Sequence, residues 1–178
     1  VHPRILPIKV DGATKEEYVW GFRVGFITYA APSSDLLAAL EQKTLGIIRA
    51  TISSGSHPSQ TFVLQALTSP EFKAQKQEKF EIMKGRANRV TQLLDSGKFD
   101  DAWGYYPFNS GYFMCLKLKT VEAEALRQHL LEQYGVGTIA LGHTDLRIAF
   151  SCIEEDNIDD LFQLIYSGVK DLEKAVAK

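Results

Sequence analysis

A long stretch without a helix-breaking pair divides this sequence into two unlike halves. It begins at Ser69-Pro70-Glu71, which has the cap-then-proline pattern of a helix start, and it ends at Ser96-Gly97. The sequence therefore predicts one helix over about residues 70–96, which is long for a single small domain. We expect this helix to link two parts of the chain, residues 1–80 and 81–178.

The half before the helix predicts an incomplete α/β unit. Ile5–Val10 and Phe22–Ala30 are apolar runs bounded by Gly, Pro, Asp or Ser, which favours strands. Because their apolarity is continuous rather than alternating, we expect strands covered on both faces, as in the parallel part of an α/β sheet. Helices are expected over residues 35–48, after a serine cap at position 33 or 34, and over residues 60–67.

The half after the helix predicts a self-contained α+β unit. Strands are expected over residues 111–119 and 145–153, with a short one within 136–141, and helices over 121–133 and 156–172. Helices layered on a small sheet bury one common core. With 45% hydrophobic residues in 178, the chain has enough apolar surface to do so.

Composition removes several classes of function. The 20 Lys and Arg are balanced by 22 Asp and Glu, so no positive field attracts nucleic acid or anionic membrane. Lys73, Lys76 and Lys79 alternate with glutamates and predict a solvated helix face. Two cysteines cannot build a disulfide framework, and four scattered histidines lack metal-ligand spacing. That pattern predicts no metal site. Since no apolar run approaches the roughly 18 residues of a membrane span, we expect a cytoplasmic protein.

A lysine and an arginine flank the turn between the two apolar runs of the first half. Lys15 follows the first run, and Arg23 opens the second. A lysine amine in an apolar site can form a Schiff base with an aldehyde, and an arginine fork suits a phosphate. Taken alone, the pattern more readily fits a solvated lysine beside Glu16 and Glu17 and an arginine in a surface ion pair.

The spacing of these residues resembles the cofactor-lysine region of the class I/II aminotransferases, fold-type I pyridoxal-phosphate enzymes typified by aspartate aminotransferase. In that family an Arg-Val-Gly strand start follows the lysine by eight residues, and Arg23-Val24-Gly25 stands eight residues after Lys15. The resemblance implies that Lys15 binds pyridoxal 5'-phosphate and acts as general base, and that Arg23 holds the phosphate. The family often has Ser or Thr one and three residues before the lysine. Thr14 keeps one such cofactor contact, whereas Gly12 departs.

Arg49 extends the resemblance to members specific for dicarboxylates. It stands 26 residues after Arg23, where those members have an arginine that reaches across the homodimer interface to the side-chain carboxylate of aspartate or glutamate. The turn Ile52–Ser56 departs from the family's Tyr-Ser-Asn-Pro-Pro. A basic residue in the last turn of a helix is also favoured by the helix dipole. Both interpretations of Arg49 stay open.

The sequence around Arg147 is a third segment that resembles the family. It lies in Leu146-Arg-Ile-Ala-Phe-Ser, which resembles the Leu-Arg-Ile-Ser-Phe strand of the family, and Gly111-Tyr-Phe resembles its Gly-x-Phe strand. The resemblance implies that Arg147 binds the α-carboxylate of the substrate. A charged group inside an apolar strand is costly without a partner or ligand, and an outward-facing strand arginine is the alternative.

The resemblance covers nearly all of the chain but only the carboxyl-terminal part of the family fold. It implies an α/β to α+β architecture, with residues 1–80 as the end of the large cofactor domain and 81–178 as the small domain. The implied reaction transfers an amino group between an amino acid and a 2-oxo acid. Because the family holds the cofactor ring with residues from its upstream half, we expect the 178 residues alone to be inactive.

Two alternatives share this fold, because fold alone does not select the reaction. One is a pyridoxal-phosphate-dependent C–S lyase or synthase. The other is the aminotransferase-like effector domain of a transcription regulator, which would follow a winged helix.

Overall fold

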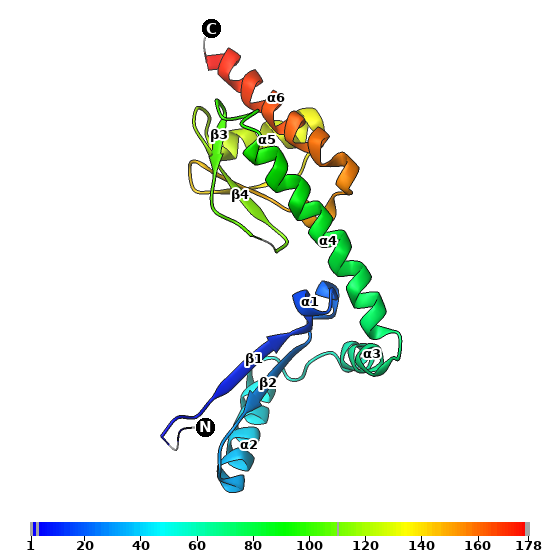
Figure 1. Cartoon of the computed structure of the whole chain (residues 1–178). Coiled ribbons are helices and arrows are strands. Elements are labelled where there is room, and N and C mark those ends of the chain that lie inside the picture. The colour runs from blue at the N-terminus through cyan, green and yellow to red at the C-terminus, as the bar shows by residue number, and fades with distance from the viewer. Residues whose placement is uncertain (1, 3, 110, 177–178) are drawn as a thin grey trace. The chain divides into compact units, whose positions relative to one another are not determined.

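The computed structural model describes residue 2, residues 4–109 and residues 111–176. The chain divides into two compact units, Val1–Lys79 and Phe80–Lys178. The division falls within helix α4, Phe72–Asp95 (Figure 1). These bounds confirm the expected long helix over about residues 70–96, to within two residues at its start. In the part of the chain that is described, no helix is long and apolar enough to cross a membrane.

The first unit alternates strands and helices. The expected serine cap is confirmed at Ser33, whose Oγ accepts the backbone N–H of Leu36 at 3.2 Å. Both expected helices are longer than predicted: the first continues to Thr51, and the second already starts at His57, after a cap by Ser56. The elements are β1 (Ile8–Gly12), α1 (Ala13–Glu16), the 3-10 turn η1 (Trp20–Phe22), β2 (Gly25–Tyr29), α2 (Ser34–Thr51) and α3 (His57–Thr68).

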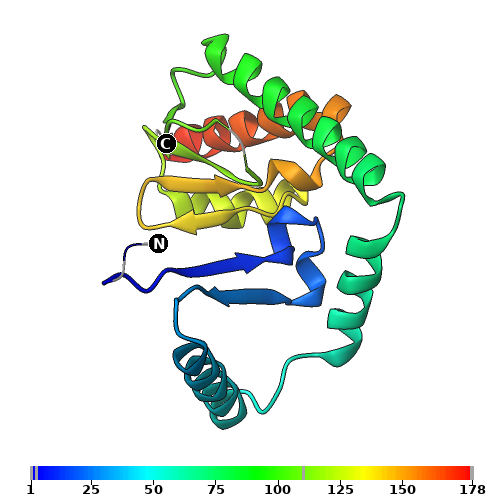
Figure 2. The same cartoon turned by 60° about the horizontal axis from the view of Figure 1, so that its bottom comes forward.

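Strands β1 and β2 form an antiparallel pair (Figure 2). In this pair Val10 lies opposite Ile27, and Gly12 lies opposite Gly25. The expected parallel arrangement is therefore wrong for this pair. A continuous apolar run indicates that both faces of a strand need cover, but it does not encode the direction of the neighbouring strand. The second strand begins at Gly25 rather than residue 22, because Arg23 has a left-handed backbone that an extended strand cannot contain.

The second unit is a four-stranded sheet with helices packed on it. The strand order is β3-β4-β6-β5, and every neighbouring pair is antiparallel. This unit confirms the α+β expectation. Its elements after α4 are β3 (Trp103–Tyr105), β4 (Met114–Leu118), α5 (Ala123–Tyr134), β5 (Ile139–Leu141), β6 (Asp145–Ile148), the 3-10 turns η2 (Phe150–Cys152) and η3 (Glu155–Asn157), and α6 (Ile158–Val176).

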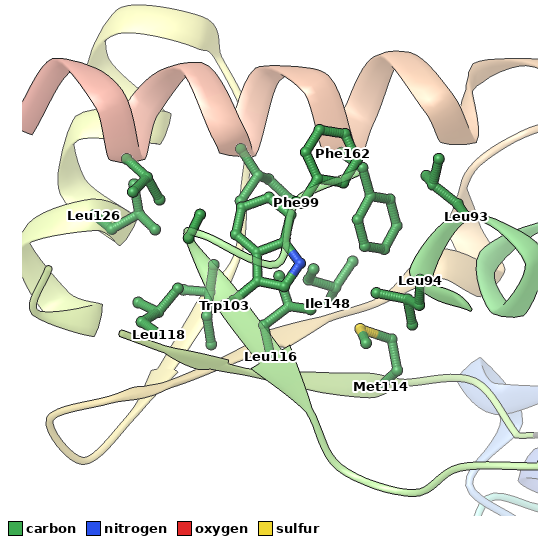
Figure 3. Close-up of a cluster of buried hydrophobic side chains, with 14 of the residues drawn as sticks. Leu93, Leu94, Phe99, Trp103, Met114, Leu116, Leu118, Leu126, Ile148 and Phe162 are labelled. Atoms are coloured by element: carbon green, nitrogen blue, oxygen red, sulfur yellow. The ribbon is translucent and has the colours of Figure 1, made fainter. Parts of the chain in front are cut away.

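One face of this sheet is buried against the helices. Leu116 and Ile148 point into this core together with Phe162 of α6 and Leu94 of α4 (Figure 3). Burying a side chain of this size contributes about 1.5–3 kcal/mol. Because side chains alternate along a strand, the residues between the buried ones, Arg147 among them, belong to the other, open face of the sheet.

In the second unit two strand predictions need correction, and one strand was not predicted. Strand β4 starts at Met114 rather than at Gly111, where a φ of 104° turns the backbone. Strand β6 ends at Ile148, since the chain turns into η2 two residues later. Strand β3 was not expected, because three residues are too short to show a periodic pattern. The short strand expected within 136–141 is confirmed as β5.

Candidate functional site

The turn between β1 and β2 carries Lys15 and Arg23 at the same end of the strand pair. Lys15 lies in α1, directly after β1, and Arg23 lies two residues before β2. The backbone N–H of Ala13 donates to the carbonyl of Val24 at 3.1 Å, so the pairing continues into the turn. Antiparallel pairing thus places the lysine and the arginine on facing ends of one short turn.

A small apolar cluster fixes this turn. Ala13, Val24 and Val63 are 1%, 8% and 3% exposed and pack together. Val63 belongs to α3, and its neighbour Phe62 stacks on Phe22 with ring centroids 5.8 Å apart. The backbone on both sides of Lys15 and Arg23 is therefore held by α3.

An ion pair ties the same turn to α4. The Nζ atom of Lys76 donates to both carboxylate oxygens of Glu17 at 3.1 Å, and the Glu17 side chain is only 15% exposed. Lys76 keeps a side chain that is 41% exposed, as expected for a solvated helix face, but its ammonium group also pairs with Glu17. The 59 residues between the partners in sequence explain why no local pattern indicated this contact.

Backbone strain is concentrated around the turn. Tyr18 has φ 57° and Arg23 has φ 53°, the left-handed region that non-glycine residues seldom adopt. Each such residue costs on the order of 1–3 kcal/mol and persists only where the surrounding contacts impose it. The chain accepts this cost two residues before η1 and directly after it, where the strained residue is the arginine that the resemblance assigns to a phosphate.

The polar groups of the turn fit an anionic aldehyde such as pyridoxal 5'-phosphate. Lys15 and Arg23 are exposed, and Thr14 is half-buried. Among the residues that the structure describes, the Arg23 guanidinium has no hydrogen bond or ion pair. An amine, a hydroxyl and an unpaired guanidinium supply what an aldehyde and a phosphate need.

Arg49 lies in the last turn of α2, the position at which the helix dipole favours a cation. Its Nη1 donates to Ser53 Oγ at 2.5 Å, and Ser53 has φ 68°. The side chain is exposed, and within the described ranges it has no carboxylate partner. Its guanidinium therefore keeps N–H groups that can bind an anion.

Arg147 lies on β6 between two fully or almost fully buried residues, Leu146 and Ile148. It is half-buried on the open face of the sheet, with its Cζ 4.7 Å from the ring centroid of Phe113. Within residues 4–109 and 111–176 it has neither a hydrogen bond nor an ion pair. A half-buried guanidinium without a carboxylate partner is an electrostatic cost that an anionic ligand would remove.

An open pocket of about 250 Å³ lies beside Arg147. Cys115 lines this pocket. Burial raises the pKa of its thiol, Asp145 raises it further, and Arg147 partly opposes this rise. The thiol is therefore protonated at neutral pH and is a packed strand residue rather than a nucleophile. The lining residues are Tyr106, Pro107, Phe108, Phe113, Met114, Cys115, Leu141 and Arg147.

The described part of the chain contains no group of three or more His, Cys, Asp or Glu side chains placed to hold an ion.

Comparison with known proteins assigns the family. The sequence model of the family "Aminotransferase class I and II" matches residues 8–165. This chain belongs to the aminotransferase class I and II family. The comparison with curated proteins finds no match.

Solved structures share the fold at low sequence identity. An aminotransferase from Anaerococcus prevotii matches with a TM-score of 0.69 at 21% identity, over 89% of this chain and 38% of that one. An aspartate aminotransferase from Thermotoga maritima gives a TM-score of 0.63 at 18% identity, over 93% and 39%. The alpha-aminoadipate aminotransferase from Thermus thermophilus, complexed with N-(5'-phosphopyridoxyl)-L-leucine, gives 0.63 at 19% identity, over 85% and 39%. The chain therefore spans about two fifths of the length of these structures.

Proposed function

We propose that this chain supplies the cofactor lysine and the small domain of a pyridoxal-phosphate-dependent aminotransferase. The observation that supports this best is the placement of Lys15 and Arg23 at one end of the β1–β2 pair, with the spacing of the family. The Thermus thermophilus structure is complexed with a phosphopyridoxyl amino acid, which agrees with such a cofactor. The reaction would move an amino group between an amino acid and a 2-oxo acid.

When bound, pyridoxal 5'-phosphate supplies an aldehyde and a ring that delocalises the electron pair left on the substrate Cα. Lys15 supplies the amine that holds the aldehyde. The same amine, once free, would act as general base: it would take the proton from the substrate Cα and deliver it to the carbon that carried the aldehyde oxygen. Arg23 and the hydroxyl of Thr14 would bind the phosphate oxygens, which would hold the cofactor ring at a fixed position relative to the amine of Lys15.

Substrate carboxylates need cations of their own. Arg147 would bind the α-carboxylate with its fork of N–H donors, while Phe113 supports the guanidinium plane. Arg49 would select a second carboxylate on an aspartate-like substrate bound in the other subunit of a homodimer. In this assignment Val1–Lys79 is the end of the large cofactor domain and Phe80–Lys178 is the small domain.

The assignment is tested by borohydride reduction of the enzyme that contains this chain. We expect reduction to fix the cofactor on Lys15, as peptide mapping by mass spectrometry would show, and Lys15→Ala to abolish both the adduct and transamination. Lys9→Ala is the matched control, because Lys9 lies on β1, directly before the turn, and its amine is engaged in an ion pair with Asp11. An adduct on any lysine other than Lys15 in the unmodified sequence would overturn the assignment.

A further inference from the structure

Asp145 places a carboxylate next to the proposed carboxylate-binding arginine. It stands two residues before Arg147 on β6, so both side chains belong to the open face of the sheet. Residues at this spacing are about 6.6 Å apart along a strand, which a long arginine side chain can bridge. An ion pair between them would occupy the group that has to bind substrate. In the described structure no such pair forms.

Tyr106 holds the Asp145 carboxylate instead. Its hydroxyl donates to Asp145 Oδ1 at 3.0 Å, and the hydroxyl of Thr144 donates to the same oxygen at 3.3 Å. The backbone of Tyr106 is fixed in turn, because its N–H donates to the carbonyl of Cys115 at 3.3 Å. The bond to Asp145 also raises the pKa of the Tyr106 hydroxyl, so this group stays a donor at neutral pH.

The Arg147 guanidinium contacts an aromatic ring instead of Asp145. Its guanidinium lies over the ring of Phe113, and Tyr106 lines the same pocket. The remaining charged side chain facing Asp145 is Lys117, which is directly opposite it on β4 and makes no ion pair with it among the described residues. Tyr106 is thus the pocket residue whose hydroxyl binds the carboxylate two residues before Arg147.

We propose that Tyr106 is a positioning residue, whose hydroxyl holds Asp145 and thereby keeps the Arg147 guanidinium open for the substrate carboxylate. This inference rests on the proposed function. It assigns a role to a hydroxyl and a carboxylate that no local sequence pattern connects, since 39 residues separate them.

The first test is Tyr106→Phe in the enzyme that contains this chain. Removing the hydroxyl releases Asp145 to pair with Arg147, so KM for both the amino acid and the 2-oxo acid should rise about three- to tenfold while kcat is unchanged. Tyr105→Phe is the matched control, because the neighbouring Tyr105 donates its hydroxyl to Asp95 and does not line the pocket. An unchanged KM in Tyr106→Phe, or an equal rise in Tyr105→Phe, overturns the inference.

The second test is rescue. In Tyr106→Phe combined with Asp145→Asn no competing anion is left, so KM should return to the value of Asp145→Asn alone. A KM that stays high in the double variant would mean that Tyr106 contacts substrate itself, and the positioning role would be wrong.

The substitution Arg147→Lys separates this inference from the function on which it rests. If Arg147 binds the carboxylate, a lysine, which lacks the bidentate fork, raises KM. A normal KM in Arg147→Lys would overturn the proposed carboxylate site and the inference with it. A raised KM in Arg147→Lys with a normal KM in Tyr106→Phe would overturn the inference alone.

Discussion

Cys115 lies directly opposite Arg147 in the antiparallel pairing of β4 with β6. Both residues line the pocket on the open face of the sheet. The thiol and the guanidinium are therefore neighbours, and a ligand bound to the arginine would cover the cysteine. This relationship gives a chemical probe of the pocket.

Alkylation should distinguish the two cysteines. Because burial raises the pKa of Cys115, its thiolate fraction is small at pH 8, and iodoacetamide should modify it more slowly than the exposed Cys152. The Cys115 rate should continue to rise above pH 9.0, the ordinary pKa of a thiol. Mass spectrometry of quenched time points measures both rates. Faster modification of Cys115 than of Cys152 would contradict the packing of Cys115 against its neighbours in the sheet.

Arg49 determines which substrate class is accepted, if it binds a second carboxylate. Arg49→Leu should then lower kcat/KM for aspartate-like substrates by on the order of 10- to 100-fold, since it removes charge-assisted hydrogen bonds. Amino acids with apolar side chains serve as the control and should react as before. An unchanged substrate profile would leave Arg49 as a cation at a helix end and would reopen the lyase alternative.

Mixed dimers test whether Arg49 acts across the subunit interface. On the proposed function, Lys15→Ala subunits and Arg49→Leu subunits should each be impaired with dicarboxylates. If Arg49 serves the other subunit, one site of the hybrid combines an intact Lys15 with an intact Arg49. Mixing should therefore restore up to about a quarter of wild-type activity, since half of the dimers are hybrids with one intact site each. No gain over the separate variants would place Arg49 in its own subunit's site.

Two helical glycines should respond oppositely to alanine. A Cβ on Gly168 of α6 would come within 2.9 Å of Leu130 Cδ2 and 3.1 Å of Leu126 Cδ1, and both leucines are fully buried. Overpacking outweighs the gain in helix propensity, so Gly168→Ala should destabilise by about 1 kcal/mol. A Cβ on Gly85 of α4 would meet only the exposed side chain of Glu155, which can turn away. Gly85→Ala should stabilise by about 0.5–1 kcal/mol.

Urea unfolding of the two glycine variants, followed by circular dichroism, measures the difference. Equal stabilities of Gly85→Ala and Gly168→Ala would show that α5 and α6 are less tightly packed than the structure indicates.

Asp171 gives the second unit a pH-dependent link between α5 and α6. The hydroxyl of Tyr134 donates to its Oδ2 at 2.6 Å, and His129 Nε2 lies 3.2 Å from the same oxygen. Tyr134 first, and then His129, lower the pKa of Asp171 below the ordinary 3.8. A lowered pKa means that the stabilisation is complete above pH 3.8 and is lost as the pH falls through the folded-state value.

Asp171→Asn should therefore lower the melting temperature at pH 7, and the difference from the unchanged chain should shrink as the pH falls below 3.8. Thermal unfolding between pH 2 and pH 7 measures this. Asp160→Asn is the control, because Asp160 lies on the same helix, is exposed, and does not contact Tyr134 or His129. A difference that is constant over this range would contradict the charged contact.

Local patterns of sequence predicted most of the regular structure. The Ser33 cap, the uninterrupted run before Ser96 and the amphipathic segments of the second half are encoded within a few residues of where they act. The left-handed backbone at Arg23 was not predicted, because neighbours from other elements impose it on a residue that does not prefer it. The same holds for the direction of the β1–β2 pairing.

The sequence by itself determined the family and the candidate residues, since the spacing of Lys15, Arg23 and Arg49 is a property of the chain alone. Only the tertiary structure decided which groups hold those residues in place. Glu17 meets Lys76, and Tyr106 meets Asp145, across 59 and 39 residues. Contacts over such separations depend on how helices and strands pack, and packing is a property of the folded chain rather than of any local pattern.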